Sequence, residues 1–295
     1  MYKRKDSKFR DRLTFSTLMV AFIPLLLFSL LVGPVMMQEI KRSSGQLTRQ
    51  MVTQTSESLD IYIGTIEKLM NFVGEESGGV LMNGSDGKSE LKEVAALILQ
   101  AYPEIAGITI AYPNDSYLGE GMTRISRDKF ADESWYRYAI EKKGRLGIIG
   151  SALGRNVVNN LNESSDSVFS LVKAFGIDHA PGSCRVVLFD IRHNLIAQLI
   201  GRVSIGEEGF LYVADDNDVV YTPTNDVVYR IDKACCQKDE KHGAEIKIRG
   251  RNYFVINCYS SYSGWRTVGV VPQTEFSAGI NFISRTLDTA YLFSP

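Results

Sequence analysis

The sequence predicts an α+β protein with an N-terminal membrane helix, a long helix directly after it, and two successive units built on antiparallel sheets. Three observations support this fold class. Residues 13–37 are apolar and carry no charge, residues 38–76 repeat apolar side chains at helical spacing, and residues 105–272 contain two sets of short β-rich segments separated by turns. The helices do not alternate regularly with the strands, so a parallel nucleotide-binding sheet is not expected.

The segment 13–37 is expected to cross a membrane. An apolar run of about 20 residues is the length that a bilayer-spanning helix requires. The preceding tail, 1–12, is mostly basic, which by the positive-inside rule places the N-terminus in the cytoplasm and the rest of the chain outside. A cleaved signal peptide is the alternative. The apolar run is long for a signal peptide and no small-x-small cleavage site follows it, so an uncleaved anchor is favoured.

Composition limits the partners and the chemistry. The chain has 295 residues and a formal net charge of −1, which argues against nucleic acid as a partner. Membrane lipid is the expected partner of the basic tail. No motif for a cofactor or a metal is present. Free thiols are expected at Cys184 and Cys258, although a bridge from Cys258 to Cys235 or Cys236 stays open.

The segment 38–76 is expected to form a stalk helix that pairs with its copy in a homodimer. Its apolar side chains recur three or four residues apart, which marks one face of a helix. Met51, Leu59 and Ile66 are the expected contacts between the two copies. An amphipathic helix that packs only on its own core is the alternative. A loop is predicted at 78–88 from its Gly, Asn, Ser and Asp content, followed by a helix over 89–101.

The first unit, 77–191, is expected to lie far from the membrane. Strands are predicted at 105–112 and 117–122 around a Pro-Asn-Asp turn, at 146–149, and in the apolar runs 168–175 and 184–191. A helix is predicted over 132–142 with Asp132 as its N-cap, and 154–166 is expected to be a polar loop.

The second unit, 192–275, is expected to lie next to the membrane. It is predicted to begin with a helix over 193–202 and to continue as strands at 209–214, 219–222, 245–249, 253–259 and 265–271. A C-terminal helix over 276–295 would lead back toward the membrane, but it is too short and polar to span it. We expect either a truncated receptor or an anchored module that works with another chain.

Several of these stretches together resemble a known family. Phe189-Asp190-Ile191, the segment Gly206 to Val213, Tyr221-Thr222-Pro223 and the closing segment Gly264 to Pro272 are similar, in order and spacing, to the double Cache sensor domain. The anchor, with Ile23-Pro24-Leu25-Leu26-Leu27, resembles the first membrane helix of YesM-like sensor histidine kinases. The resemblance implies two tandem PAS-like modules outside a bacterial cell, the distal one binding a small ligand.

The resemblance also implies a ligand site. Amino-acid-binding members of the family use an Arg-x-Trp-Tyr motif and a later Asp. Here the matching residues are Trp135, Tyr136 and Asp190, while Glu133 replaces the arginine. A carboxylate does not pair with a ligand carboxylate, so a cationic or polyhydroxyl ligand is expected rather than a simple amino acid. The candidate ligand-binding residues are Trp135, Tyr136, Asp190, Glu133, Asp132, Arg155 and Lys173.

Each candidate residue also has an ordinary structural interpretation. Trp135 and Tyr136 on a helix can simply pack against a sheet, Asp190 and Asp132 can cap helices, and Arg155 and Lys173 can be solvated cations.

The function expected from these observations is extracellular small-molecule sensing in a bacterial receptor of the sensor histidine kinase type, with the effector absent from this sequence. The sensory half of a chemoreceptor or of a diguanylate cyclase is the alternative in the same class. A membrane-anchored extracytoplasmic hydrolase is the alternative in another class. The three histidines are scattered and neither HExxH nor GxSxG occurs, so an enzyme is not expected.

Overall fold

The computed structural model describes residues 3–150, 152, 154–160, 167–176, 184–215, 219–221, 227–231 and 243–275. Within the first range, the side chains of 79–86 and of many positions before residue 42 lie outside the description. The predicted C-terminal helix over 276–295 lies outside the described residues, as do Cys235 and Cys236. The structure combines long helix with antiparallel sheet, which confirms the predicted α+β class.

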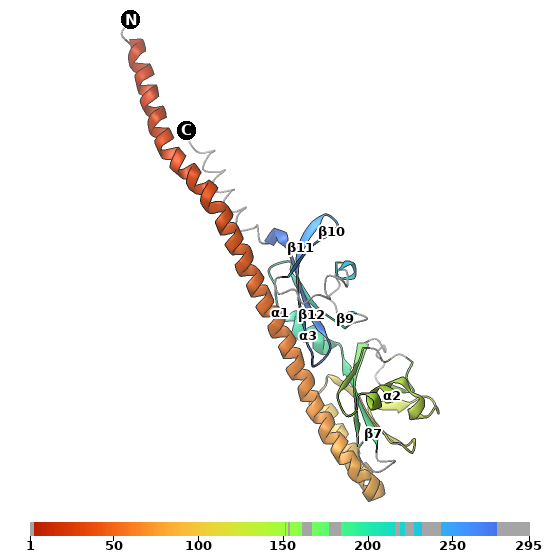
Figure 1. Cartoon of the computed structure of the whole chain (residues 1–295). Coiled ribbons are helices and arrows are strands. Elements are labelled where there is room, and N and C mark those ends of the chain that lie inside the picture. Colours follow the sequence, from red (N-terminus) through yellow and green to blue (C-terminus); the bar gives the residue numbers. More distant parts are fainter. Residues whose placement is uncertain are drawn as a thin grey trace.

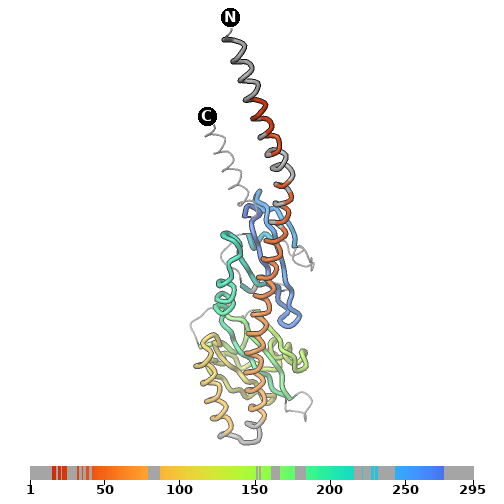
Figure 2. The backbone as a smooth tube through the Cα atoms, turned by 90° about the vertical axis from the view of Figure 1, so that its left-hand side faces the viewer, coloured from red at the N-terminus to blue at the C-terminus, as the bar shows by residue number. Residues whose placement is uncertain are grey.

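One helix, α1 (Lys3–Ala101), runs along both sheets (Figure 1). Its helical assignment includes 78–88, where the sequence predicts a loop. Glycine disfavours a helix by only about 1 kcal/mol per residue, an amount that tertiary packing overrides. Figure 2 shows residues 87–101 beside the preceding part of α1 and running in the opposite direction. Leu91, Ala95 and Ile98 accordingly share one apolar core with Ile66 and Met70.

The first sheet has the strand order β2-β1-β7-β6-β4, and every pair in it is antiparallel. Its strands are β1 (Ile105–Ala111), β2 (Tyr117–Glu120), β4 (Gly147–Ile149), β6 (Val168–Phe175) and β7 (Arg185–Arg192). Beside it lie a two-stranded sheet of β3 (Met122–Arg124) and β5 (Val157–Asn159), the 3-10 helix η1 (Phe130–Asp132), and the helix α2 (Ser134–Glu141). We call this group the distal module.

The distal sheet is covered on both faces, because successive side chains of a strand point to opposite sides. Phe169 and Leu171 of β6 pack into the core that contains α1. Val172 of β6 and Leu188 of β7 pack into a second core with Trp135 of α2. The sheet therefore separates an α1 side from an α2 side, and each residue's place in a strand decides which side it reaches.

The second sheet has the order β10-β11-β12-β8-β9 and is also antiparallel throughout. We call it, with its helices, the proximal module. Its elements are α3 (Asn194–Gly201), β8 (Phe210–Ala214), β9 (Val219–Tyr221), η3 (Val228–Arg230), β10 (Ala244–Ile248), β11 (Arg251–Tyr259) and β12 (Arg266–Pro272). The two sheets are separate and the chain passes from one to the other through α3, as the order of the predicted strands indicates.

The buried face of α1 includes two residues that were expected to contact a second copy. Leu59 and Ile66 are 3% and 1% exposed and belong to the chain's own core, so they are wrong as contacts between two copies. The spacing that identifies a buried helical face does not tell which partner buries it. The other face of α1 carries exposed Leu47, Ile61 and Phe72.

In the part of the chain that the structure describes, no helix meets the length and apolarity that a membrane crossing requires. Many side chains of the expected span, 13–37, lie outside that part. The span therefore stays a prediction.

Candidate functional site

A buried ion pair lies on the α2 side of the distal sheet. Arg155, which precedes β5, donates from Nη1 and Nη2 to the two carboxylate oxygens of Asp190 on β7, at 2.8 and 2.7 Å. The side chains are 3% and 0% exposed. Ser170, opposite Asp190 in the β6–β7 register, also donates to Asp190, at 2.6 Å. The arginine reaches the Ser170 hydroxyl at 2.7 Å and the Ala152 carbonyl at 3.3 Å. The pair is thus neutral as a unit and extensively hydrogen-bonded.

This arrangement gives Asp190 and Arg155 roles that sequence reasoning missed. Asp190 does not cap α3, whose N-cap is His193 without a side-chain cap bond. Arg155 is buried rather than solvated. A bidentate arginine already occupies the two carboxylate oxygens, so a cation from outside would have to compete with it.

The aromatic pair of α2 is buried against the same face of the sheet. Trp135 is 1% exposed, and its ring makes edge contacts with Phe130 and Tyr136, with centroids 5.8 and 5.9 Å apart. The indole Nε1 of Trp135 has no hydrogen-bond partner among the described residues. Burial, with a smaller effect from Cys184, raises the pKa of Tyr136 to about 12. Its hydroxyl therefore stays protonated at neutral pH and can donate a hydrogen bond.

Asn156 joins this region, and nothing in the sequence singled it out from its polar loop. Its backbone N–H donates to Oε2 of Glu133 at 3.3 Å, and its Nδ2 donates to the Asp128 carbonyl at 3.3 Å. Its Oδ1 is buried and has no partner in the described part of the chain. Glu133 is the N-cap residue of α2 but makes no side-chain cap bond. Asp132 ends η1 and is exposed, so its predicted role as the cap of α2 is wrong.

Lys173 lies apart from these residues. It follows Phe169 and Leu171 on alternate positions of β6, and its Nζ donates to Oε1 of Glu67 on α1 at 2.5 Å. The distal sheet therefore stands between Lys173 and the Arg155–Asp190 pair. The structure brings together Trp135, Tyr136, Glu133, Arg155 and Asp190, and it separates Lys173 from them.

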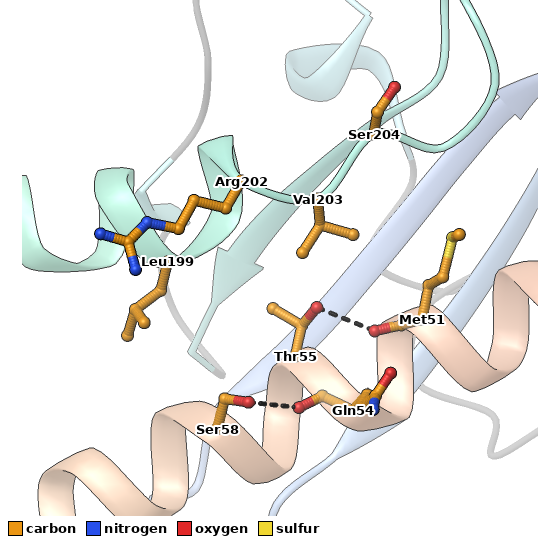
Figure 3. Close-up of a pocket in the computed structure, with 8 residues that line it drawn as sticks. All are labelled: Met51, Gln54, Thr55, Ser58, Leu199, Arg202, Val203 and Ser204. Atoms are coloured by element: carbon orange, nitrogen blue, oxygen red, sulfur yellow. Dashed lines mark hydrogen bonds between the residues drawn. The ribbon is translucent and has the colours of Figure 1, made fainter.

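A distinct pocket of about 520 Å³ lies between α1 and α3 in the proximal module. Figure 3 shows its lining: Met51, Gln54, Thr55, Ser58, Leu199, Arg202, Val203 and Ser204. The hydroxyls of Thr55 and Ser58 donate to helix carbonyls one turn earlier, at 2.8 Å each. None of the predicted ligand residues lines this pocket.

The distal site contains groups that can form hydrogen bonds with a small molecule. The site combines aromatic surface with one free donor, Trp135 Nε1, and one free acceptor, Asn156 Oδ1. Among the described residues, no cluster of three or more His, Cys, Asp or Glu side chains suits a metal ion. Cys184 and Cys258 are free thiols and only partly buried.

The fold is shared with solved ligand-binding domains. The ligand-binding domain of Mlp24 with asparagine superposes with a TM-score of 0.59 at 16% identity, over 83% of this chain and 98% of that one. The Campylobacter jejuni chemoreceptor Tlp3 domain, in complex with 4-methylisoleucine, gives 0.60 at 10% identity, over 81% and 94%. The Pseudomonas aeruginosa chemoreceptor PctC domain, in complex with GABA, gives 0.60 at 9% identity, over 77% and 99%.

At these identities the likeness establishes the fold and not the ligand. It supports the double Cache architecture that the sequence resembles, without indicating a YesM-like kinase. No protein-family model matches the sequence, and a comparison with curated proteins finds no match.

Proposed function

We propose that this chain is the extracellular small-molecule sensing module of a bacterial membrane receptor for signal transduction. The observation that carries the proposal is the fold, since 81–83% of this chain superposes on solved ligand-binding domains and covers 94–98% of their length. The sensor histidine kinase type rests on the resemblance of the anchor alone, and a chemoreceptor fits the fold equally well. The chain itself is proposed to bind and not to catalyse.

The proposed ligand site lies on the α2 side of the distal module. Trp135 and Tyr136 supply apolar wall, while Trp135 Nε1 and Asn156 Oδ1 supply one donor and one acceptor. Because Arg155 neutralises Asp190, a cation finds no open carboxylate at that residue. The unpaired donor and acceptor support the polyhydroxyl option of the two that the sequence left open. A hydroxyl group both donates and accepts, so neighbouring hydroxyls satisfy both unpaired atoms.

The proposed placement is a single span at 13–37 with the N-terminus in the cytoplasm and lipid around the helix. Exposed apolar side chains at Phe15, Val20, Ile23 and Val35 support it, because such a surface is unfavourable in water. A homodimer through α1 is proposed as well. Leu47, Ile61 and Phe72, exposed on the face of α1 that points away from the sheets, are its contacts.

The test is a thermal-shift screen of the full chain in detergent against polyols and sugars, amines and amino acids. A compound that binds only the folded state raises the melting temperature. Trp135→Phe keeps an aromatic ring but removes the indole N–H, so we expect it to weaken binding about tenfold, the effect of one hydrogen bond.

Tyr253→Phe, at a buried aromatic residue of the proximal sheet, is the matched control and should bind as the wild type does. If no compound of any class binds, the sensing function is contradicted. If a compound binds wild type and Trp135→Phe equally, the ligand site lies elsewhere.

A further inference from the structure

One carboxylate on α1 contacts both modules. Oε1 of Glu67 accepts a hydrogen bond from Nζ of Lys173 on β6 at 2.5 Å, and Oε2 accepts one from the Tyr262 hydroxyl at 2.6 Å. Lys173 belongs to the distal sheet. Tyr262 belongs to the turn 260–265, which joins β11 to β12 in the proximal sheet. Glu67 therefore connects two segments that have no strand pairing with each other.

The turn 260–265 is held on α1 at a second point. The buried Ser260 hydroxyl lies 2.8 and 2.7 Å from the two carboxylate oxygens of Asp60. The same oxygen accepts the backbone N–H groups of Tyr262 and Ser263, each at 3.1 Å. Asp60 and Glu67 are two helical turns apart on one side of α1. These hydrogen bonds fix the position and shape of the turn independently of the bond from Tyr262 to Glu67.

An aromatic contact joins the same two segments. The rings of Phe169 on β6 and Trp265 at the end of the turn meet edge-to-face, with centroids 5.2 Å apart and planes at 72°. Phe169 and Lys173 lie on one side of β6, four positions apart. Two contacts therefore connect β6 to the turn: the hydrogen bonds through Glu67 and the ring contact of Phe169 with Trp265. Both lie on the side of the sheet that faces α1.

The charges at Glu67 favour the bridged arrangement. Burial tends to raise the pKa of Glu67, but the hydrogen bonds from Lys173 and Tyr262 and the charge of the lysine outweigh it and lower the pKa. Burial and the hydrogen bond to Glu67 raise the pKa of Tyr262. The Glu67 carboxylate and the neutral Tyr262 phenol are therefore the stable states at neutral pH, and they are the states that the hydrogen bond between them needs.

We propose that Glu67 is the coupling residue of the protein, which makes the position of the turn 260–265 depend on the position of β6. Ser170 of β6 bonds Asp190 on the α2 side of the sheet, and Lys173 of the same strand bonds Glu67 on the α1 side. A displacement of β6 at the candidate site moves both contacts. The mechanical coupling is independent of the proposed function, whereas its use in signalling rests on that function.

Hydrogen–deuterium exchange of the full chain in detergent tests the coupling without a ligand. Lys173→Met removes the ammonium in the distal module, and we expect amide exchange in the turn 260–265 of the other module to rise about threefold to tenfold. Lys173→Arg retains a cation and should restore most of the protection. Tyr262→Phe should have the reciprocal effect on β6.

Lys92→Met is the matched control. Lys92 of α1 pairs with Glu120 of β2 at 4.0 Å and its side chain is 63% exposed, so its loss should leave the turn unchanged. Equal exchange in the turn for Lys173→Met and Lys92→Met would overturn the proposal. A rise in exchange spread evenly over both modules would also overturn it, because that pattern indicates general destabilisation. Neither result bears on whether the distal module binds a ligand.

Discussion

Arg155 and Asp190 face each other across the distal module as a buried, bidentate ion pair, although 35 residues separate them in the sequence. The pair replaces two charges that would be unfavourable in the core with one neutral, hydrogen-bonded group. A ligand at the proposed site would meet this neutral group and not an open Asp190 carboxylate.

Breaking the pair from one side should therefore be costly. We expect Arg155→Met or Asp190→Asn to lower the free energy of unfolding by about 3–5 kcal/mol, because each leaves a buried group without its partner. Urea denaturation followed by circular dichroism measures the loss. Asp132→Asn, at an exposed position of the same module, should change stability by less than about 0.5 kcal/mol. A loss of the same small size in Arg155→Met would show that the pair contributes little.

The Glu67 bridge predicts an acid-sensitive component of stability. The pKa of Glu67 is lowered below its ordinary value of 4.5 in the folded state. A carboxyl group of this kind contributes stability above its unfolded pKa, and the contribution is lost as the pH falls through the folded value. Melting temperatures measured from pH 7 to pH 3 should thus fall more for the wild type than for Glu67→Gln. Parallel curves for the two proteins would contradict this.

Gly206 is predicted to be intolerant of a side chain. It has φ +68°, and a Cβ there would overlap the Glu275 carboxylate, which accepts the N–H groups of Glu207 and Glu208 at 3.1 and 2.6 Å. Gly206→Ala should lose about 1 kcal/mol to backbone strain and a further 1–2 kcal/mol from the displaced hydrogen bonds.

Gly250→Ala is the control for strain alone, because Gly250 has φ +82° and no atom within 4 Å of the added carbon. The difference between the two variants in urea denaturation isolates the role of Glu275. Equal losses would mean that Glu275 adds nothing.

Cross-linking should locate the proposed contact between two copies of α1. In a background with the native cysteines replaced by serine, we expect disulfide dimers from Leu47→Cys, Ile61→Cys and Phe72→Cys in membranes. Leu59→Cys is buried in the chain's own core and should give none. Dimers at Leu59 but not at Ile61 would reverse the assignment of the two faces.

Local patterns predicted much of the fold. The Pro-Asn-Asp turn forms as expected, with Asn114 Oδ1 accepting the Ser116 N–H at 3.1 Å and Asp115 at φ 64°. The hydrogen bond and the backbone angle both depend on residues close in sequence. Local propensity and turn chemistry are therefore enough to predict this turn. Alternation likewise placed β10, where exposed and partly buried positions alternate. Runs rich in β-branched and aromatic residues placed β6 and β7, which are buried on both faces.

The candidate site was only partly predictable, for the opposite reason. Trp135 and Tyr136 came from a motif, but the partner of Asp190 depends on where the chain before β5 crosses the sheet. The polar stretch around Arg155 and Asn156 has no periodicity from which the position of the chain could be predicted. Lys173 and Glu67 are 106 residues apart, and no local pattern indicates that they meet. The face of α1 that packs on the sheets was predicted, and packing on the chain's own core was one of the two interpretations of that face. The spacing alone does not decide between the sheets and a second copy.

Asp60 and Ser260 are in contact although 200 residues separate them in the sequence. During synthesis, Asp60 therefore waits for its partner until the intervening chain has been made. At about 5–20 residues per second, a ribosome takes on the order of 10–40 s to make the intervening chain. During that time the part of the apolar face of α1 that the proximal sheet covers, with Val52 beside Gly269 of β12, has no proximal strands over it. Contacts of such long range also form slowly in the isolated protein. The nascent chain is thus exposed to aggregation for longer than a protein whose first helix packs on its nearest neighbours.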